Sequence, residues 1–225
     1  MAEAPRSVLF AAGAAVLVIV GCLVTAYTLR PPTAPVPRAG ESSSADAGLR
    51  CGTTACRPVV TSTVGQDQVE VLAGEGGGRI RVTGPAGPNI FESTVVESGG
   101  QFDAQSLECV SAPVSVCLVR GKAGDELLGE VLVGRAGVWT RVQARYLATG
   151  GYLALNDVDG DQVADVVAVQ RPCDPTGCGK SYAQVFSFTA GKALLGCTTV
   201  VNAVEDLPGW PAVAPATADL GSCGA

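Results

Sequence analysis

The sequence predicts an all-β domain that follows one N-terminal transmembrane helix. Residues 69–82, 129–142 and 183–196 each contain an alternating apolar run, a glycine-bearing turn and a second run. This pattern is typical of a β-hairpin. Helix signals are nearly absent after Arg30. The repeated hairpins predict about three blade-like β units, in a propeller-like or sandwich arrangement.

The predicted helix is an uncharged run of 23 residues, from residue 7 to residue 29. At about 1.5 Å per residue it is roughly 34 Å long, enough to cross a hydrocarbon core of about 30 Å. We expect residues 1–29 to be a single-pass membrane anchor or a signal segment. Two alternatives remain open: cleavage by signal peptidase at Val24-Thr25-Ala26, or a lipid on Cys22, which ends a lipobox-like stretch. All of these would place the C-terminal part outside the cytoplasm.

The next segment, residues 30–48, is rich in Pro, Ser and Ala and shows no apolar periodicity. Such a segment cannot bury enough apolar surface to offset the entropy lost on ordering, so it is expected to be a linker. Residues 49–225 then form the predicted extracytoplasmic, disulfide-rich β domain.

Composition excludes several classes of function. The chain has no histidine, which removes Ser-His-Asp and Cys-His catalysis as well as His-ligated zinc. Its formal net charge is -6 and it has no basic stripe, so nucleic acid is not an expected partner. The high content of Ala, Val and Gly is typical of a bacterium with a GC-rich genome.

The chain has nine cysteines, and all except Cys22 lie outside the apolar run. An even number in an exported domain predicts disulfides. Local spacing favours the pairs Cys51–Cys56, Cys109–Cys117 and Cys173–Cys178, with Cys197 and Cys223 left over. The alternative is a zinc site of four thiolates, but no local pair has the C-x2-C spacing of a zinc knuckle.

Upstream of each hairpin a second similarity extends the repeat. The upstream stretches are residues 49–64, 107–119 and 155–169, and each ends in a valine-rich run. In this alignment the equivalent hairpin valines are Val71, Val131 and Val185. The C-terminal residues 202–225 are expected to lie over the domain, held by Cys223.

Four aspartates precede the valine-rich run of the third unit: Asp157, Asp159, Asp161 and Asp165. Their alternate spacing allows carboxylates of a curled loop to converge on one hard cation such as Ca²⁺, with the carbonyl of Val163 as the expected backbone ligand. A solvated turn is the alternative. An EF-hand would need Gly in place of Gln162 and Glu in place of Ala168, and it would lie between helices.

This loop resembles the calcium loop of the integrin-type FG-GAP repeat, roughly D-x-D-G-D-G-x-x-D-h-h-h between two strands of a propeller blade. The resemblance covers about 14 residues and implies a Ca²⁺ site in a blade. It departs from the family at Gln162, where Gly is usual and φ is often positive, so strain or a weaker site is expected there. The first two units lack these acids, and Cys51 and Cys109 align near the corresponding place.

Other candidate groups give weaker signals. Trp139 and Trp210 would form a ligand platform or, by the simpler interpretation, pack in the core and the tail. The glycine-rich residues 74–78 predict a hairpin turn and not a phosphate loop, since no helix follows them. Scattered carboxylates that a glycoside hydrolase would need to pair are Glu92, Glu97, Asp125, Glu126 and Glu130.

Two functional classes follow from these patterns. The first is a non-catalytic, calcium-stiffened module at the cell surface that binds a protein or a cell-wall glycan, with self-association possible because three units do not close a ring. The second is an extracytoplasmic hydrolase that uses carboxylates. A secreted structural protein is a further alternative.

Overall fold

The computed structural model describes residues 49–173, 177–188 and 194–223. The predicted membrane segment, residues 7–29, and the predicted linker, residues 30–48, lie outside these residues. All described residues belong to the compact unit Ala45–Ala225. Within the described ranges no helix has the length and apolar character needed to cross a membrane.

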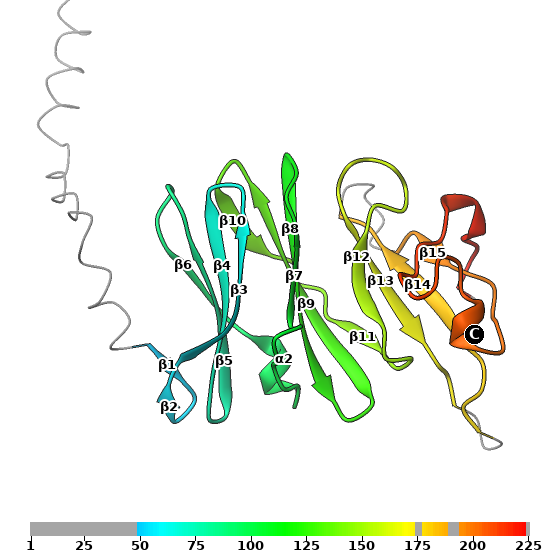
Figure 1. Cartoon of the computed structure of the whole chain (residues 1–225), viewed down its shortest axis with the longest axis horizontal. Coiled ribbons are helices and arrows are strands. Elements are labelled where there is room, and N and C mark those ends of the chain that lie inside the picture. The colour runs from blue at the N-terminus through cyan, green and yellow to red at the C-terminus, as the bar shows by residue number, and fades with distance from the viewer. Residues whose placement is uncertain (1–48, 174–176, 189–193, 224–225) are drawn as a thin grey trace, which may run out of the picture. The chain divides into compact units, whose positions relative to one another are not determined.

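The described chain is mostly antiparallel β-structure, and its three larger sheets follow one another along the sequence (Figure 1). None of the sheets closes into a barrel among these residues. The first larger sheet has the strand order β3-β4-β5-β6. Its strands are β3 (Arg57–Val64), β4 (Asp67–Gly74), β5 (Gly77–Thr83) and β6 (Asn89–Glu92).

The second sheet has the order β10-β9-β8-β7, and β11 pairs with the same edge of β9 as β10 does. Its strands are β7 (Leu107–Val110), β8 (Val114–Ala123), β9 (Glu126–Arg135), β10 (Val138–Arg141) and β11 (Tyr146–Ala148). The third sheet has the order β12-β13-β14-β15. Its strands are β12 (Leu153–Asn156), β13 (Asp165–Gln170), β14 (Tyr182–Phe186) and β15 (Gly196–Cys197).

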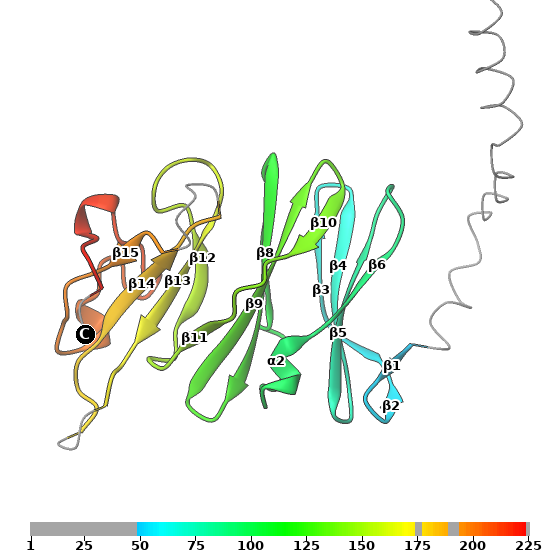
Figure 2. The ribbon, with the colours of Figure 1, turned by 180° about the vertical axis from the view of Figure 1, so that it is seen from behind.

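Short elements complete the described domain. A two-stranded ribbon, β1 (Arg50–Cys51) with β2 (Thr54–Ala55), precedes the first sheet. The helix α2 (Thr94–Glu97) lies between the first two sheets near β5 and β9 (Figure 2). Two 3-10 turns, η2 (Val204–Asp206) and η3 (Thr217–Asp219), lie in the C-terminal segment.

Burial patterns explain which strand sequences alternate and which are continuously apolar. In β5, Ile80 and Val82 are buried against the second sheet, while Arg79 and Arg81 lie on the outer face and pair with Glu92 and Glu70. The strands β8, β9 and β13 instead carry runs that are buried on both faces. A sheet with a covered face on each side has no reason to alternate.

Three apolar cores hold the layers together. One joins the first and second sheets and includes Val71 and Leu132, and a second joins the second and third sheets and includes Val131 and Val166. The third lies on the outer face of the third sheet, where Leu207 and Val213 of the C-terminal segment pack on the sheet. The expectation that residues 202–225 lie over the domain is therefore confirmed for the described residues.

Four disulfides are present: three join the cysteines that local spacing pairs, and the fourth joins the two cysteines left over, Cys197 and Cys223. The bonds are Cys51–Cys56, Cys109–Cys117, Cys173–Cys178 and Cys197–Cys223. The alternative of four zinc thiolates is therefore wrong. The glycine-rich stretch is a hairpin turn as predicted, since β4 ends at Gly74 and β5 begins at Gly77.

The repeat exists, but its alignment is displaced by one strand in the first unit. The predicted hairpins of the second and third units correspond to the third and fourth strands of their sheets, whereas Val71 lies in β4, the second strand of its sheet. Every adjacent antiparallel pair gives the same apolar-turn-apolar pattern, so sequence alone cannot fix the offset. As a consequence Cys109 does lie beside the turn equivalent to the acidic loop, while Cys51 lies before the first sheet.

An ion pair caps the open edge of the third sheet. Arg120 of β8 donates to the Leu153 carbonyl (2.6 Å) and to Glu108 (2.5 Å), and Glu108 accepts from the Leu155 amide (3.2 Å). The guanidinium and the carboxylate thus occupy the donor and acceptor positions that a neighbouring strand would offer to β12. Capping of this kind removes backbone groups that would otherwise recruit another chain.

Replacing Arg120 tests the edge cap. Arg120→Met keeps a long side chain of similar apolar length but removes the donor to the Leu153 carbonyl and to Oε2 of Glu108. We expect the free energy of unfolding, measured with urea, to fall by about 1.5–3 kcal/mol. The control is Arg79→Met, which breaks a pair whose glutamate is 70% exposed and should cost less than about 1 kcal/mol. Equal losses in the two variants would contradict the capping role.

Candidate functional site

The acidic residues lie in the loop that joins β12 to β13, residues 157–164, with Asp165 opening β13. Their carboxylates shape the loop by accepting backbone hydrogen bonds. Asp157 accepts from Gly160 (2.9 Å) and Gln162 (3.1 Å), and Asp161 accepts from Val163 (2.8 Å). Aspartate side chains commonly stabilise turns in this way.

Two residues of the loop have left-handed backbone conformations. Gly160 has a φ of 76° and Gln162 a φ of 68°. Glycine adopts this region freely, whereas a residue with a Cβ atom loses roughly 1–2 kcal/mol there. The expectation that Gln162 occupies a positive-φ position is confirmed.

Three of the predicted ligands meet. Asp157, Asp159 and Asp165 each offer a carboxylate oxygen, and these oxygens lie within 4.8 Å of one another. Asp161 is not in this group, and one of its oxygens accepts from the Val163 amide. The Val163 side chain is buried, and the role of its carbonyl stays a prediction.

Asp165 is the unusual member of the group, because it is completely buried. Its Oδ2 accepts from the Val158 amide (2.9 Å), while its Oδ1 is enclosed and has no hydrogen-bond partner among the described residues. Burial, with the charge of Asp159 adding to it, raises the pKa of Asp165 to about 6. The side chain of Ser187 and the Val158 amide partly offset the cost of burying this carboxylate, and a proton or a cation would offset more of it.

Apolar anchors hold the loop on both sides of the third sheet. Val163 packs into the core between the second and third sheets, and Val158 packs into the core under the C-terminal segment. The two valines fix the ends of the acidic loop, while Asp157 and Gly160 between and beside them remain exposed. The exposed side gives a cation access to the carboxylates.

A cleft lies between the first two sheets at one end of their strands, and we call it the end cleft. Its volume is about 580 Å³. Four hairpin turns line it, at residues 65–67, 85–86, 111–113 and 136–137, together with Trp139. These turns are at the same end of the sheets as the acidic loop, the upper end in Figure 1.

Trp139 forms part of the cleft floor and is 5% exposed. Its Nε1 donates to Asp67 (2.8 Å), and a Cβ atom on Gly134 would lie 2.8 Å from its ring. The simpler interpretation, core packing, therefore holds for most of this side chain. Trp210 is 39% exposed and contacts the ring of Tyr152, on the C-terminal side of the domain.

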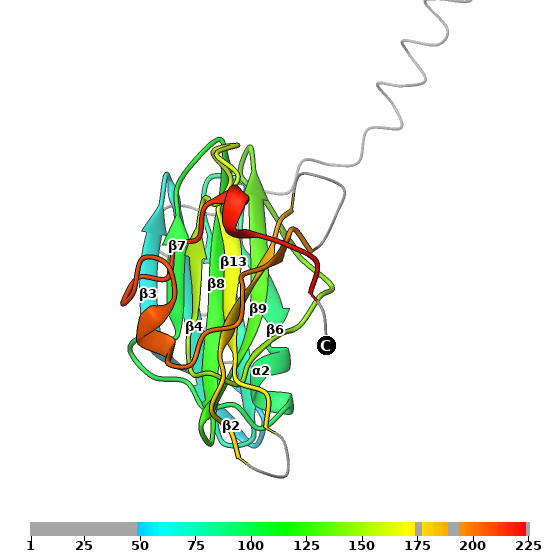
Figure 3. The same ribbon diagram turned by 90° about the vertical axis from the view of Figure 1, so that its right-hand side faces the viewer.

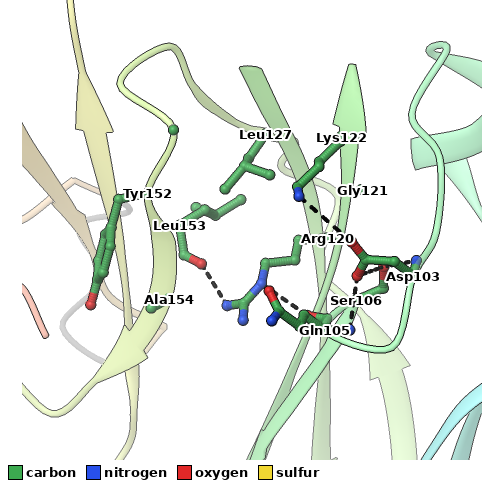
Figure 4. A pocket seen from close by; sticks show the side chains of 11 residues that line it. Asp103, Gln105, Ser106, Arg120, Gly121, Lys122, Leu127, Tyr152, Leu153 and Ala154 are labelled. Carbon is green, nitrogen blue, oxygen red and sulfur yellow. Dashed lines mark hydrogen bonds and ion pairs between the residues drawn. The ribbon is translucent and has the colours of Figure 1, made fainter. Parts of the chain in front are cut away.

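A second, polar cleft lies beside the edge cap (Figure 4). It has a volume of about 290 Å³ and includes Arg120, Lys122, Asp103 and the backbone of Leu153. Arg120 is committed to the cap, and Lys122 faces Asp103 at 3.8 Å. These charges are balanced by one another, so the cleft presents no strong field to a charged ligand.

The scattered carboxylates do not form a paired acid and base. Glu130 is buried and accepts from Ser93 (2.6 Å) and from the Thr94 hydroxyl (3.0 Å), which ties α2 to the second sheet. Glu92 pairs with Arg79 on the outer face of the first sheet. The other candidates, Glu97, Asp125 and Glu126, are exposed.

No family model, curated protein or solved structure matches the chain. The resemblance to the FG-GAP repeat therefore rests on the loop residues themselves. The sequence did not indicate that Val158 anchors the loop. It also did not indicate the role of Thr217, which donates to the Val158 carbonyl (3.1 Å). Neither has a local pattern that could have singled it out.

The raised pKa of Asp165 predicts a pH dependence for the metal-free protein. Because the folded state binds the proton more tightly than the unfolded state, the contribution of Asp165 to stability is present below about pH 4 and is lost as the pH rises to about 6. In EDTA at pH 7.5, Asp165→Asn should therefore raise the free energy of unfolding by up to about 3 kcal/mol.

The measurement is urea unfolding of both proteins in EDTA between pH 4 and pH 8. The stability difference between wild type and Asp165→Asn should grow across that interval and then level off. Asp125→Asn, which changes an exposed carboxylate, is the control and should stay within about 0.5 kcal/mol of wild type. A constant difference at every pH would show that Asp165 is ionised to the same extent in both states.

Proposed function

We propose that the chain is a membrane-anchored, non-catalytic binding module whose β domain lies outside the cytoplasm and is stiffened by one calcium ion. The observation that carries the proposal is that the completely buried carboxylate of Asp165, one oxygen of which is enclosed, belongs to a group with the carboxylates of Asp157 and Asp159. Burying a carboxylate that has few hydrogen bonds is unfavourable, and a nearby cation would compensate its charge. The four disulfides support an oxidising compartment.

Calcium fits the donor set better than the other common ions. The ligands on offer are carboxylate oxygens and, as proposed, the Val163 carbonyl, with Asp161 adjacent. Zinc prefers Cys and His, and all eight described cysteines are bonded in disulfides. Magnesium demands a near-ideal octahedron, whereas calcium accepts six to eight oxygens in flexible geometries. When bound, the ion would neutralise the carboxylates and hold the loop between its two anchoring valines.

We infer further that the three larger sheets are blades of an incomplete propeller. Each is an antiparallel meander in chain order, and each packs face to face on the next. The acidic loop connects the first two strands of its sheet, which agrees with its resemblance to a propeller calcium loop. The C-terminal segment covers the face on which a following blade would pack.

We propose the end cleft as the ligand site, with an uncharged glycan of the cell wall as the ligand. Small turn residues and two prolines give it smooth walls, Ser111 and Gln66 offer hydrogen-bonding groups, and none of its described lining residues is Lys or Arg. Asp67 is its one charged residue, which disfavours anionic ligands. Pockets of this kind take ligands whose orientation a few polar groups can fix.

Calcium binding is tested by thermal melting with 10 mM calcium and with EDTA. For a dissociation constant of about 10⁻⁴–10⁻³ M, mass action stabilises the folded state by roughly 1.4–2.7 kcal/mol, or a Tm increase of about 3–10 °C. Asp157→Asn should lose this increase. Gln162→Gly should bind calcium more tightly, because glycine removes the strain at φ 68°.

The control for the charge change is Asp206→Asn, an exposed aspartate of η2, which should retain the full increase. If wild type and Asp157→Asn melt alike in both solutions, and titration detects no calcium, the loop is a solvated turn and the proposed metal site is wrong.

The ligand site is tested by filling the cleft. Ala86 is exposed in a turn that lines it, so Ala86→Trp should block the cleft while preserving the fold. We expect wild type to sediment with insoluble peptidoglycan and Ala86→Trp to lose at least tenfold in affinity. Ala55→Trp, an exposed alanine of β2, is the control. Undiminished peptidoglycan binding by Ala86→Trp would exclude the end cleft as the ligand site. If the wild type binds a protein but not peptidoglycan, the proposed glycan ligand is wrong.

A further inference from the structure

The C-terminal segment, residues 204–223, is fastened to the third sheet at three places. Leu207 and Val213 are buried in the core on the outer face of that sheet. Cys197 and Gly221 exchange two backbone hydrogen bonds (3.0 and 2.8 Å), and the disulfide Cys197–Cys223 closes the end. Figure 3 shows the segment, in orange and red, lying over the sheet.

The same segment reaches the acidic loop through a short chain of hydrogen bonds. The hydroxyl of Thr217, at the start of η3, donates to the Val158 carbonyl (3.1 Å). The amide of Val158 in turn donates to Oδ2 of the buried Asp165 (2.9 Å). Thr217 therefore fixes the backbone residue that orients the enclosed carboxylate, although it lies 59 positions from Val158 in the sequence.

The Val158 side chain makes a second connection. It is 8% exposed and belongs to the same apolar core as Leu207 and Val213. Val158 is thus held by the C-terminal segment through both its side chain and its carbonyl, and it stands between Asp157 and Asp159, two members of the carboxylate group. A shift of Val158 would move both neighbours together with Asp165.

We propose that Thr217 is a positioning residue of the cation site, and that the C-terminal segment and the bound cation stabilise each other. This inference rests on the proposed calcium site. Coupling between two binding events is reciprocal, so a segment that raises the affinity for calcium must itself be held more firmly when calcium is bound. The segment, which the Cys197–Cys223 disulfide keeps attached, then packs more firmly on the third sheet when calcium is bound.

The test uses the full-length protein purified in detergent, with calcium as the probe and titration calorimetry as the measurement. Thr217→Val removes the hydroxyl and keeps the shape, and we expect calcium affinity to fall about threefold to tenfold, the effect of one hydrogen bond. Thr217→Ser keeps the hydroxyl and should retain most of the affinity. Thr140→Val, which removes a hydroxyl that donates to the Val133 carbonyl in the second sheet, is the control and should bind as wild type does.

Amide hydrogen exchange supplies the reciprocal readout. In wild type, calcium should slow exchange of residues 204–223, including the Gly221 amide, and this slowing should be smaller in Thr217→Val. Wild-type calcium binding with an unchanged affinity in Thr217→Val would overturn the positioning role while leaving the calcium site intact. Failure of the wild type itself to bind calcium would overturn both proposals, so the two failures are distinguishable.

Discussion

Packing of apolar side chains between the faces of successive sheets holds the domain together. The outer faces and the strand edges of the sheets must then be stabilised in other ways. In a row of three sheets, packing between the sheets leaves two outer faces uncovered and several strand edges without hydrogen-bond partners. The outer face of the first sheet is made polar by the pairs Arg79–Glu92 and Arg81–Glu70. The opposite outer face is apolar and is covered by the C-terminal segment. The difference explains why β5 alternates and β13 does not.

The acidic loop is placed where two of these cores end. Val163 enters one core and Val158 the other, so the loop connects the packing on both faces of the third sheet. Asp165, which follows Val163 by two residues, is buried with them, and burial makes its charged form less favourable. The cost of burying this carboxylate is one of desolvation, and a bound cation would reduce it.

Local sequence patterns predict what depends on neighbours along the chain. The β class, the hairpin turn at residues 74–78 and the local disulfides follow from spacing and residue type, whereas the positive φ of Gln162 follows from the resemblance to the FG-GAP loop. The features that escaped prediction join distant segments. Two examples are the hydrogen bonds from Thr217 to Val158 and from Arg120 to Leu153. The acceptor is a backbone carbonyl in both, so neither contact produces a recognisable pattern in the sequence. The strand offset in the first unit has the same origin, since every adjacent pair of strands has the same apolar pattern.

Comparison of the equivalent turns shows why one unit would use a metal and another a covalent bond. In the second sheet the turn between β7 and β8 is short, and Cys109 and Cys117 face each other across the two strands with a Cα separation of 4.1 Å. A disulfide can close a turn of that size. In the third sheet the equivalent loop spans residues 157–164 and must keep two valines buried on opposite faces of the sheet. One cross-strand bond could not hold both ends, whereas a cation with ligands at Asp157, Asp159 and Asp165 would join the start, the middle and the end of the loop at a single point.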